Sequence, residues 1–193
     1  MKIYTGVGSR ETPSDILALM EDIGFHLAAQ GWKLRSGGAQ GADQAFENGW
    51  WKFRQTQDIC YQADDYVCYL PWEGYEDHYR TTHDGKNVIP SMIHFDVEAK
   101  AEKMASEIHP AWEACKQGAR KMHTRNVFQV LGHTLDQPSK MLIAWTKLSG
   151  SGLPKGGTAT AIALAKANGI QTFNLNIEAD KERIVKWLET LKQ

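Results

Sequence analysis

Residues 2–20 read KIYTGVGSRETPSDILALM and contain the unit that decides the fold. Lys2–Thr5 predicts a short β-strand, which Gly6 ends. Thr12 and Pro13 favour the start of a helix, because threonine caps helices and proline suits the first helical position. Apolar residues follow at spacings of three and four, which is typical of a helix with one buried face. A strand, a glycine-rich turn and a helix in this order predict an α/β protein.

The rest of the chain repeats this alternation. Further strands are expected at 32–35, 66–70, 141–145 and 170–175, with a short one at 92–95, and further helices at 41–54, 96–108, 111–131, 158–168 and 178–191. Strands that alternate with helices predict parallel pairing with helices on both faces. We therefore expect an α/β three-layer sandwich with a mainly parallel five-stranded sheet. The chain reads as one domain, 1–193, with a helical and loop insertion at about 72–135.

Composition and charge exclude several classes of protein. The 22 basic and 23 acidic residues give a net charge of −1, whereas dedicated duplex binders usually carry a basic excess. No apolar run approaches the ~20 residues that span a bilayer, and glycines and charges interrupt the start too early for a signal peptide. Three cysteines without a CxxC pair indicate neither a disulfide framework nor a zinc knuckle. We expect a cytoplasmic protein with no membrane contact, no cofactor and no metal.

The glycines mark the expected ligand site. Nine of the 17 lie in three windows, 6–8, 37–41 and 150–157, and each window follows a predicted strand and precedes a predicted helix. Ligands of open α/β sheets bind beyond the carboxyl ends of the strands. Glycine lets the backbone approach a ligand closely, and a helix start offers free N–H groups to phosphate. Neither GxGxxG nor GxxxxGK[ST] is complete, so the windows predict phosphate binding without a standard dinucleotide or P-loop motif.

The first and third windows supply most of the candidate ligand contacts. Ser9 and Arg10 can both bind a phosphate, although a tight turn with an arginine in solvent explains them too. In the third window Thr158 can cap the next helix while the preceding glycine amides face an anion. The two windows, with the end of the strand before the third, contribute Gly8, Ser9, Arg10, Thr146, Lys155, Gly156, Gly157 and Thr158.

The second window is followed by two carboxylates. Asp43 falls in the first helical turn, and Glu47 lies four residues on, on the same helical face. Paired carboxylates can perform acid–base work or bind ribose hydroxyls. Helix capping explains Asp43 as well, and a solvated helix face explains Glu47. Both residues are the candidate catalytic groups.

Three motifs, TGVGSR, SGGAQGAD and GGTATA, together resemble the SLOG superfamily. This Rossmann-like group includes the LONELY GUY phosphoribohydrolases, the DNA-processing protein A family and the YpsA-like proteins. The first two motifs look most like the YpsA and DNA-processing protein A branch, which is frequent in phages and mobile elements. The resemblance spans about 2–71 and 140–176. It implies a Rossmann-like fold and a crevice for a nucleotide-derived ligand, lined by Gly8, Ser9, Arg10, Ser36, Gly37, Gly38, Asp43, Gly156, Gly157 and Thr158.

One departure from the family pattern bears on activity. The LONELY GUY enzymes carry PGGxGTxxE, whose glutamate takes part in N-glycosidic cleavage. Here Gly156, Gly157 and Thr158 are followed by ATAIA, with no acidic residue and without the extra glycine. The resemblance therefore implies ligand binding and leaves catalysis open.

The insertion adds four candidate contacts. Its basic segment at 116–125 can close over a phosphorylated ligand, and a solvated basic face or a weak phosphate-backbone patch are the alternatives. An aromatic ring directly after a strand can stack on a purine. These arguments select Trp72, Arg120, Arg125 and Asn126.

The sequence favours a protein that binds a nucleotide-derived signalling ligand, as a sensor or a sequestering sponge, with phage–host conflict as one setting. The alternatives are a nucleotide-processing N-glycosidase or phosphoribohydrolase, and a single-stranded-DNA-binding recombination mediator. A small molecule is the expected partner. Nucleic acid is not favoured, and self-association stays open.

Overall fold

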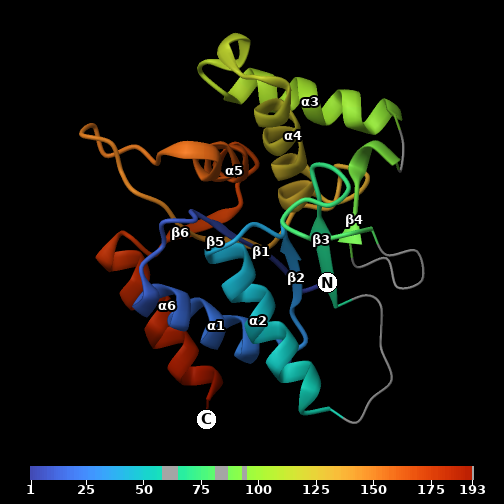
Figure 1. Cartoon of the computed structure of the whole chain (residues 1–193). Helices are drawn as coiled ribbons and strands as arrows, with labels where there is room; N and C mark the ends of the chain where they lie inside the picture. Colours follow the sequence, from blue (N-terminus) through green and yellow to red (C-terminus); the bar gives the residue numbers. More distant parts are fainter. Residues whose placement is uncertain (58–64, 81–86, 93–94, 193) are drawn as a thin grey trace.

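The computed structural model describes residues 1–57, 65–80, 87–92 and 95–192. In this part of the chain a parallel sheet lies between two layers of helices (Figure 1). The sheet has the order β4-β3-β2-β1-β5-β6. Its strands are β1 (Ile3–Gly8), β2 (Lys33–Ser36), β3 (Tyr66–Tyr69), β4 (Asn87–Val88), β5 (Met141–Trp145) and β6 (Gln171–Asn174). The α/β sandwich is confirmed, and the expected five strands become six because β4 is a two-residue edge strand without a sequence pattern of its own.

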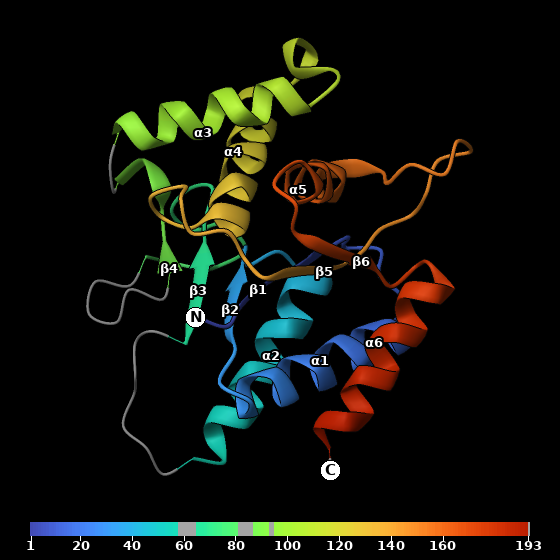
Figure 2. The ribbon, with the colours of Figure 1, turned by 180° about the vertical axis from the view of Figure 1, so that it is seen from behind.

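The helices divide between the two faces. They are α1 (Ser14–Ala29), α2 (Ala42–Gln55), α3 (Phe95–Ile108), α4 (Gln117–Leu131), α5 (Gly156–Ala167) and α6 (Glu178–Leu191). Figures 1 and 2 show α1, α2 and α6 on one face, and α4 and α5 on the other with α3 across α4. None of the described helices is long and apolar enough to cross a membrane.

Side chains of β5 alternate between the two cores, as the pleat of a strand requires. Met141, Ile143 and Trp145 are buried against α1, α2 and α6, whereas Leu142 and Ala144 are buried on the side of α4 and α5. Every residue of this strand is therefore covered, which explains its continuous apolar sequence.

The structure corrects two local predictions. The helix expected over 111–131 is broken: a 3₁₀ turn at Trp112–Ala114 and an extended Cys115 precede α4. No proline or glycine marks this break, which places Trp112 and Cys115 near two histidines. The strand expected at 92–95 is wrong at both ends, because Met92 ends a 3₁₀ turn and Phe95 begins α3, while 93–94 lie outside the described residues.

Two helix starts also differ from the prediction. Pro13 is the N-cap of α1, and the Thr12 hydroxyl donates instead to the Ser9 carbonyl oxygen at 2.7 Å. Helix α5 begins at Gly156 after an N-cap at Lys155, so Thr158 lies within the first turn and does not cap. The two glycines are therefore part of the helix start itself.

The strand order fixes where a ligand can bind. From β1 the chain builds β2, β3 and β4 on one side and later β5 and β6 on the other. Strand order reverses between β1 and β5, which pair in parallel from Tyr4–Met141 to Gly8–Trp145. Such a switch point leaves a crevice at the carboxyl ends of the two strands.

Candidate functional site

A cavity of about 370 Å³ lies at this switch point, a volume typical of small-molecule sites. The loops after β1 and β5 and the start of α2 form one part of its wall, and α4 forms another. Eleven of the sixteen predicted ligand residues line it: Gly8, Ser9, Arg10, Asp43, Arg125, Asn126, Thr146, Lys155, Gly156, Gly157 and Thr158. Whether they bind a ligand stays a prediction.

The start of α5 forms one end of the cavity. The N-cap Lys155 makes no side-chain capping bond, and the first turn carries no acidic residue. A Cβ added at Gly156 or Gly157 would meet nothing within 4 Å, so no protein atom crowds these backbone positions. The free N–H groups and the positive end of the helix dipole together favour an anion here.

Two side chains hold the loop before α5 in place. The Asn126 amide donates to the Gly157 carbonyl oxygen at 3.0 Å. The Thr146 hydroxyl donates to the Lys155 carbonyl oxygen at 2.8 Å. Both residues were predicted as ligand contacts, and in the structure each hydrogen-bonds to the backbone at the start of α5. The helix start is therefore fixed before any ligand arrives.

Arg10 lies at the rim of the cavity. Its side chain is 58% exposed, forms an ion pair with Glu76 and donates to the Tyr75 hydroxyl at 3.4 Å. A phosphate entering the cavity would have to compete with Glu76 for this guanidinium. Because an exposed ion pair is worth at most about 1 kcal/mol, the exchange costs little.

Asp43 is a buried carboxyl within the cavity wall. Its Oδ1 accepts from the Gly8 amide at 3.0 Å, and its Oδ2 lies 3.9 Å from Arg125 Nη1. Burial raises the pKa of Asp43 from 3.8 to about 7; Arg125 lowers it in opposition, and Glu47 raises it further. A carboxyl that titrates near neutral pH can both donate and accept a proton.

Arg125 is fixed by the second glycine window. Its Nη1 donates to the carbonyl oxygens of Gly37 and, at 3.4 Å, Tyr69. A Cβ at Gly37 would lie 2.5 Å from Arg125 Cζ and 2.6 Å from Gln129 Nε2. Only glycine allows this approach, so Gly37 acts by admitting the guanidinium and does not itself line the cavity.

Gln129 lines the cavity and was not among the predicted residues. Its side chain is fully buried and lines the cavity, yet neither its amide nitrogen nor its amide oxygen has a partner among the described residues. The buried Arg125 Nε also has no hydrogen-bond partner among the described residues. Buried polar groups are nearly always hydrogen-bonded, so unpaired ones in a cavity wall fit a polar ligand. Gln129 lies four residues after Arg125, and this spacing was the available signal.

His123 and Tyr75 also line the cavity without having been selected. The His123 Nδ1 lies 3.0 Å from the Thr160 hydroxyl. Burial, with smaller contributions from His109 and Arg125, lowers the pKa of His123 to about 4. This histidine is therefore neutral at physiological pH.

Glu47 and its partners lie beneath the cavity. The Ser36 hydroxyl donates to Glu47 Oε1 at 2.5 Å, and the Gly38 amide donates to the same oxygen at 3.1 Å. Burial raises the pKa of Glu47. The structure thus separates the expected carboxylate pair: Asp43 faces the cavity, and Glu47 holds the loop behind it.

Trp72 and Arg120 lie away from the cavity. The Trp72 ring packs edge-on against Tyr75, with the ring centroids 5.1 Å apart. The expected placement of Trp72 differs from the observed one because a position after a strand end does not fix where the side chain points. Arg120 lies over the Trp112 ring at 5.3 Å and donates to the Cys115 carbonyl oxygen at 3.2 Å. It precedes Arg125 by five residues, so the two occupy different faces of α4.

Fold and site together define a Rossmann-like α/β protein with a small-molecule-sized cavity at its switch point. No family model and no curated relative matches the chain. A solved structure of DNA processing protein A from Helicobacter pylori, studied for its single-stranded DNA binding mode, matches over 98% of this chain and 81% of that chain. The identity is 15% and the TM-score is 0.38.

Proposed function

We propose that this chain binds a small nucleotide-derived ligand in the cavity and acts by sensing or sequestering it. The unpaired amide of Gln129, in the same cavity as the uncapped start of α5, carries the proposal. The first feature calls for an uncharged polar partner and the second for an anion. A nucleotide offers both groups in one molecule.

The arrangement of the wall suggests an orientation for such a ligand. The phosphate binds at Gly156 and Gly157, where Lys155 and Arg10 add positive charge. The Gln129 amide and the Asp43 carboxyl then bind ribose hydroxyls or a base edge. The net charge of −1 fits this reading, because a few local cations suit one phosphorylated molecule better than a long polyanion.

Calorimetry on the full chain tests the proposal. Mono-, di- and cyclic nucleotides and ADP-ribose derivatives form the panel, and mass spectrometry of the heat-denatured protein identifies any small molecule retained through purification. We expect heat with at least one panel member and a loss of that heat in Gln129→Met. Gln55→Met, the same change at an exposed site on α2, is the matched control. No heat with any member and no retained molecule would refute ligand binding.

A second candidate is the hydrolysis of a nucleotide, and the raised pKa of Asp43 is the observation that favours it. Chromatography of AMP, NAD and cyclic nucleotides after incubation measures this activity. A hydrolase loses turnover in Asp43→Asn and keeps ligand affinity within a few fold. Unchanged substrate peaks at high protein concentration leave binding alone as the function.

An oligonucleotide titration separates these readings from single-stranded DNA binding. Binding through phosphate contacts weakens steeply as salt rises. Salt-sensitive binding of poly-dT that Gln129→Met does not change would assign the function to a surface outside the cavity. We expect the nucleotide panel, and not poly-dT, to respond to that substitution.

A further inference from the structure

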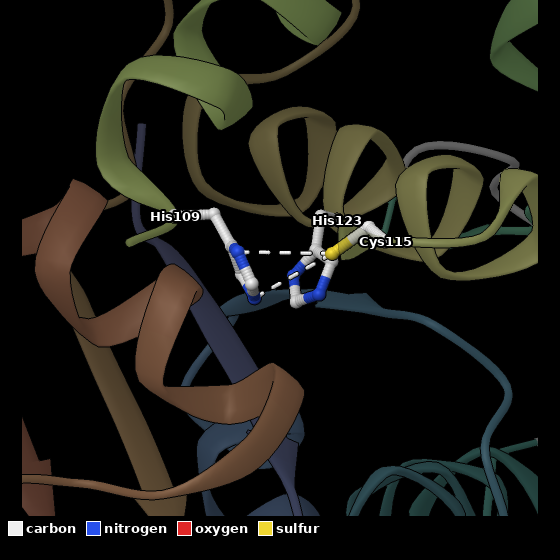
Figure 3. Close-up of side chains that lie close together, drawn as sticks. All are labelled: His109, Cys115 and His123. Carbon is white, nitrogen blue, oxygen red and sulfur yellow. Dashed lines mark hydrogen bonds between the residues drawn. The ribbon is translucent and has the colours of Figure 1, made fainter. Parts of the chain in front are cut away.

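His109, Cys115 and His123 gather at the connection between α3 and α4 (Figure 3). His109 follows the last turn of α3, Cys115 follows the 3₁₀ turn, and His123 lies on α4. The candidate ligand atoms of all three side chains lie within 4.8 Å of one another. The Cys115 sulfur is 3.7 Å from His109 Nδ1 and 3.9 Å from its Nε2, and the two imidazole centroids are 4.3 Å apart.

These separations approach those of a tetrahedral metal centre. Zinc–sulfur and zinc–nitrogen bonds of about 2.3 and 2.0–2.1 Å place neighbouring ligand atoms about 3.4–3.6 Å apart. The separations of the ligand atoms exceed these values by at most about 1.4 Å, so small side-chain movements bring the three ligands to one ion. A set of two imidazoles and one thiolate favours Zn²⁺ over the other common divalent ions of cells.

The surroundings of His123 also fit a metal ligand. The Thr160 hydroxyl on α5 lies 3.0 Å from Nδ1, and both residues are buried. A ligating histidine usually fixes its second ring nitrogen in such a hydrogen bond. With Nδ1 engaged by Thr160, Nε2 is the nitrogen left for coordination.

We propose that His109, Cys115 and His123 form a zinc-binding site with one open coordination position. A second cavity of about 440 Å³ adjoins this site, and His109, His123 and Gly157 all line it. The fourth position is therefore available to water or a small anion, as in zinc sites with three protein ligands. His123 also lines the nucleotide cavity, so the ion would stiffen the wall that α4 and α5 share.

The spacing of these residues explains why the sequence did not reveal them. The pattern His-x₅-Cys-x₇-His contains none of the short CxxC or HxxxH pairs that announce a zinc site. The break before α4 brings Cys115 back toward His109. A second group, Glu47, Cys68 and His78, is also close enough to share an ion. Its Glu47 Oε1 accepts from both Ser36 and Gly38, whereas His109 accepts from the Ala111 amide through Nδ1 at 3.2 Å and keeps Nε2 for the ion.

Metal titration of the full chain tests the site without any nucleotide. The protein is stripped with a chelator under reducing conditions, and Zn²⁺ is titrated against a chromophoric competitor. Co²⁺ is then bound as a spectroscopic probe. We expect one zinc per chain, and a cobalt spectrum with a sulfur-to-cobalt charge-transfer band and the intense visible bands of tetrahedral coordination.

Three variants locate the binding to these residues. Cys115→Ser removes the charge-transfer band and weakens zinc binding by more than a hundredfold. Thr160→Val keeps every ligand and weakens binding about ten- to a hundredfold, the usual effect of losing a partner of a ligating histidine. His26→Ala, on α1 at the opposite face, leaves affinity and spectrum unchanged.

Two results would overturn the site. One is equal zinc affinity in the wild-type and Cys115→Ser chains. Zinc bound at Glu47, Cys68 and His78 instead would give this result. The other is a cobalt complex without the charge-transfer band. Far-ultraviolet circular dichroism of Cys115→Ser confirms that its fold persists, and because this side chain is only half-buried we expect no change.

Discussion

If the Gln129 amide hydrogen-bonds to a ligand, replacing Gln129 by methionine should raise the stability of the free protein and weaken ligand binding. Methionine has a similar length and no amide, so it keeps the packing and removes the unpaired donor and acceptor. The backbone carbonyl of residue 129 still accepts from the Thr5 hydroxyl at 2.8 Å. The substitution therefore tests the amide and little else.

The expected magnitudes follow from the unpaired amide. A buried polar group without a partner costs about 1–3 kcal/mol, so removing it from the free protein should stabilise by about 1 kcal/mol after some loss to repacking. In a chain of this length that gain raises Tm by roughly 2–4 °C. Two hydrogen bonds to a ligand are together worth about 1–3 kcal/mol, so affinity should fall about ten- to a hundredfold.

Thermal unfolding and calorimetry of the same preparations measure both effects. Gln55→Met should leave Tm and affinity unchanged, since exposed substitutions usually stay within about 0.5 kcal/mol. A loss of about 2 kcal/mol in free Gln129→Met would mean that the amide is paired inside the protein. Unchanged ligand affinity would mean that it does not face the ligand. Either result would refute the reasoning.

Three further substitutions test other parts of the cavity. Because the folded-state pKa of Asp43 is raised from 3.8 to about 7, its buried carboxyl lowers stability as pH rises through this window, by up to about 4 kcal/mol. Urea unfolding should therefore show Asp43→Asn more stable than wild type at pH 8 but not at pH 4. Gly157→Asp should raise Tm slightly, because a negative charge in the first turn interacts favourably with the helix dipole. The same variant should weaken nucleotide binding at least tenfold by calorimetry, while the control Gly157→Ala retains binding. Gly37→Ala should cost about 1–3 kcal/mol in urea unfolding, because its Cβ displaces the Arg125 guanidinium; equal stability would show that Arg125 can move away freely.

The sequence predicted well the helices and strands whose apolar pattern lies within the segment itself. The run at 141–145 and the helix at 178–191 agree with β5 and α6 at both ends. The break at Cys115 has no such signal, because it depends on contacts with residues elsewhere in the fold. Strand β4 has only two residues, too few for an alternating pattern.

The candidate site was predictable to the extent that topology decides it. Carboxyl ends of parallel strands meet at one edge, so the residues of the first and third windows were brought together as expected. The face of α4 that meets the cavity depends on tertiary packing. The sequence therefore could not separate Arg125, which lines the cavity, from Arg120, which does not. Gln129 carries no charge and gave no signal beyond its spacing.

The segment at about 72–135, predicted to be an insertion, bears on which ligand the proposed site would select. The start of α5 offers free backbone N–H groups that suit a phosphate, whereas the Gly8 and Gly38 amides of the other two windows are paired with Asp43 and Glu47. The segment 72–135 contributes Tyr75, Arg125 and Gln129 to the cavity wall, and these groups, together with Asp43 of α2, can distinguish one base or sugar from another. A chain with the same three windows and a different α4 would then keep the phosphate and change the rest of the ligand. Specificity should accordingly follow substitutions on α4, whereas substitutions at the start of α5 should weaken all phosphorylated ligands alike.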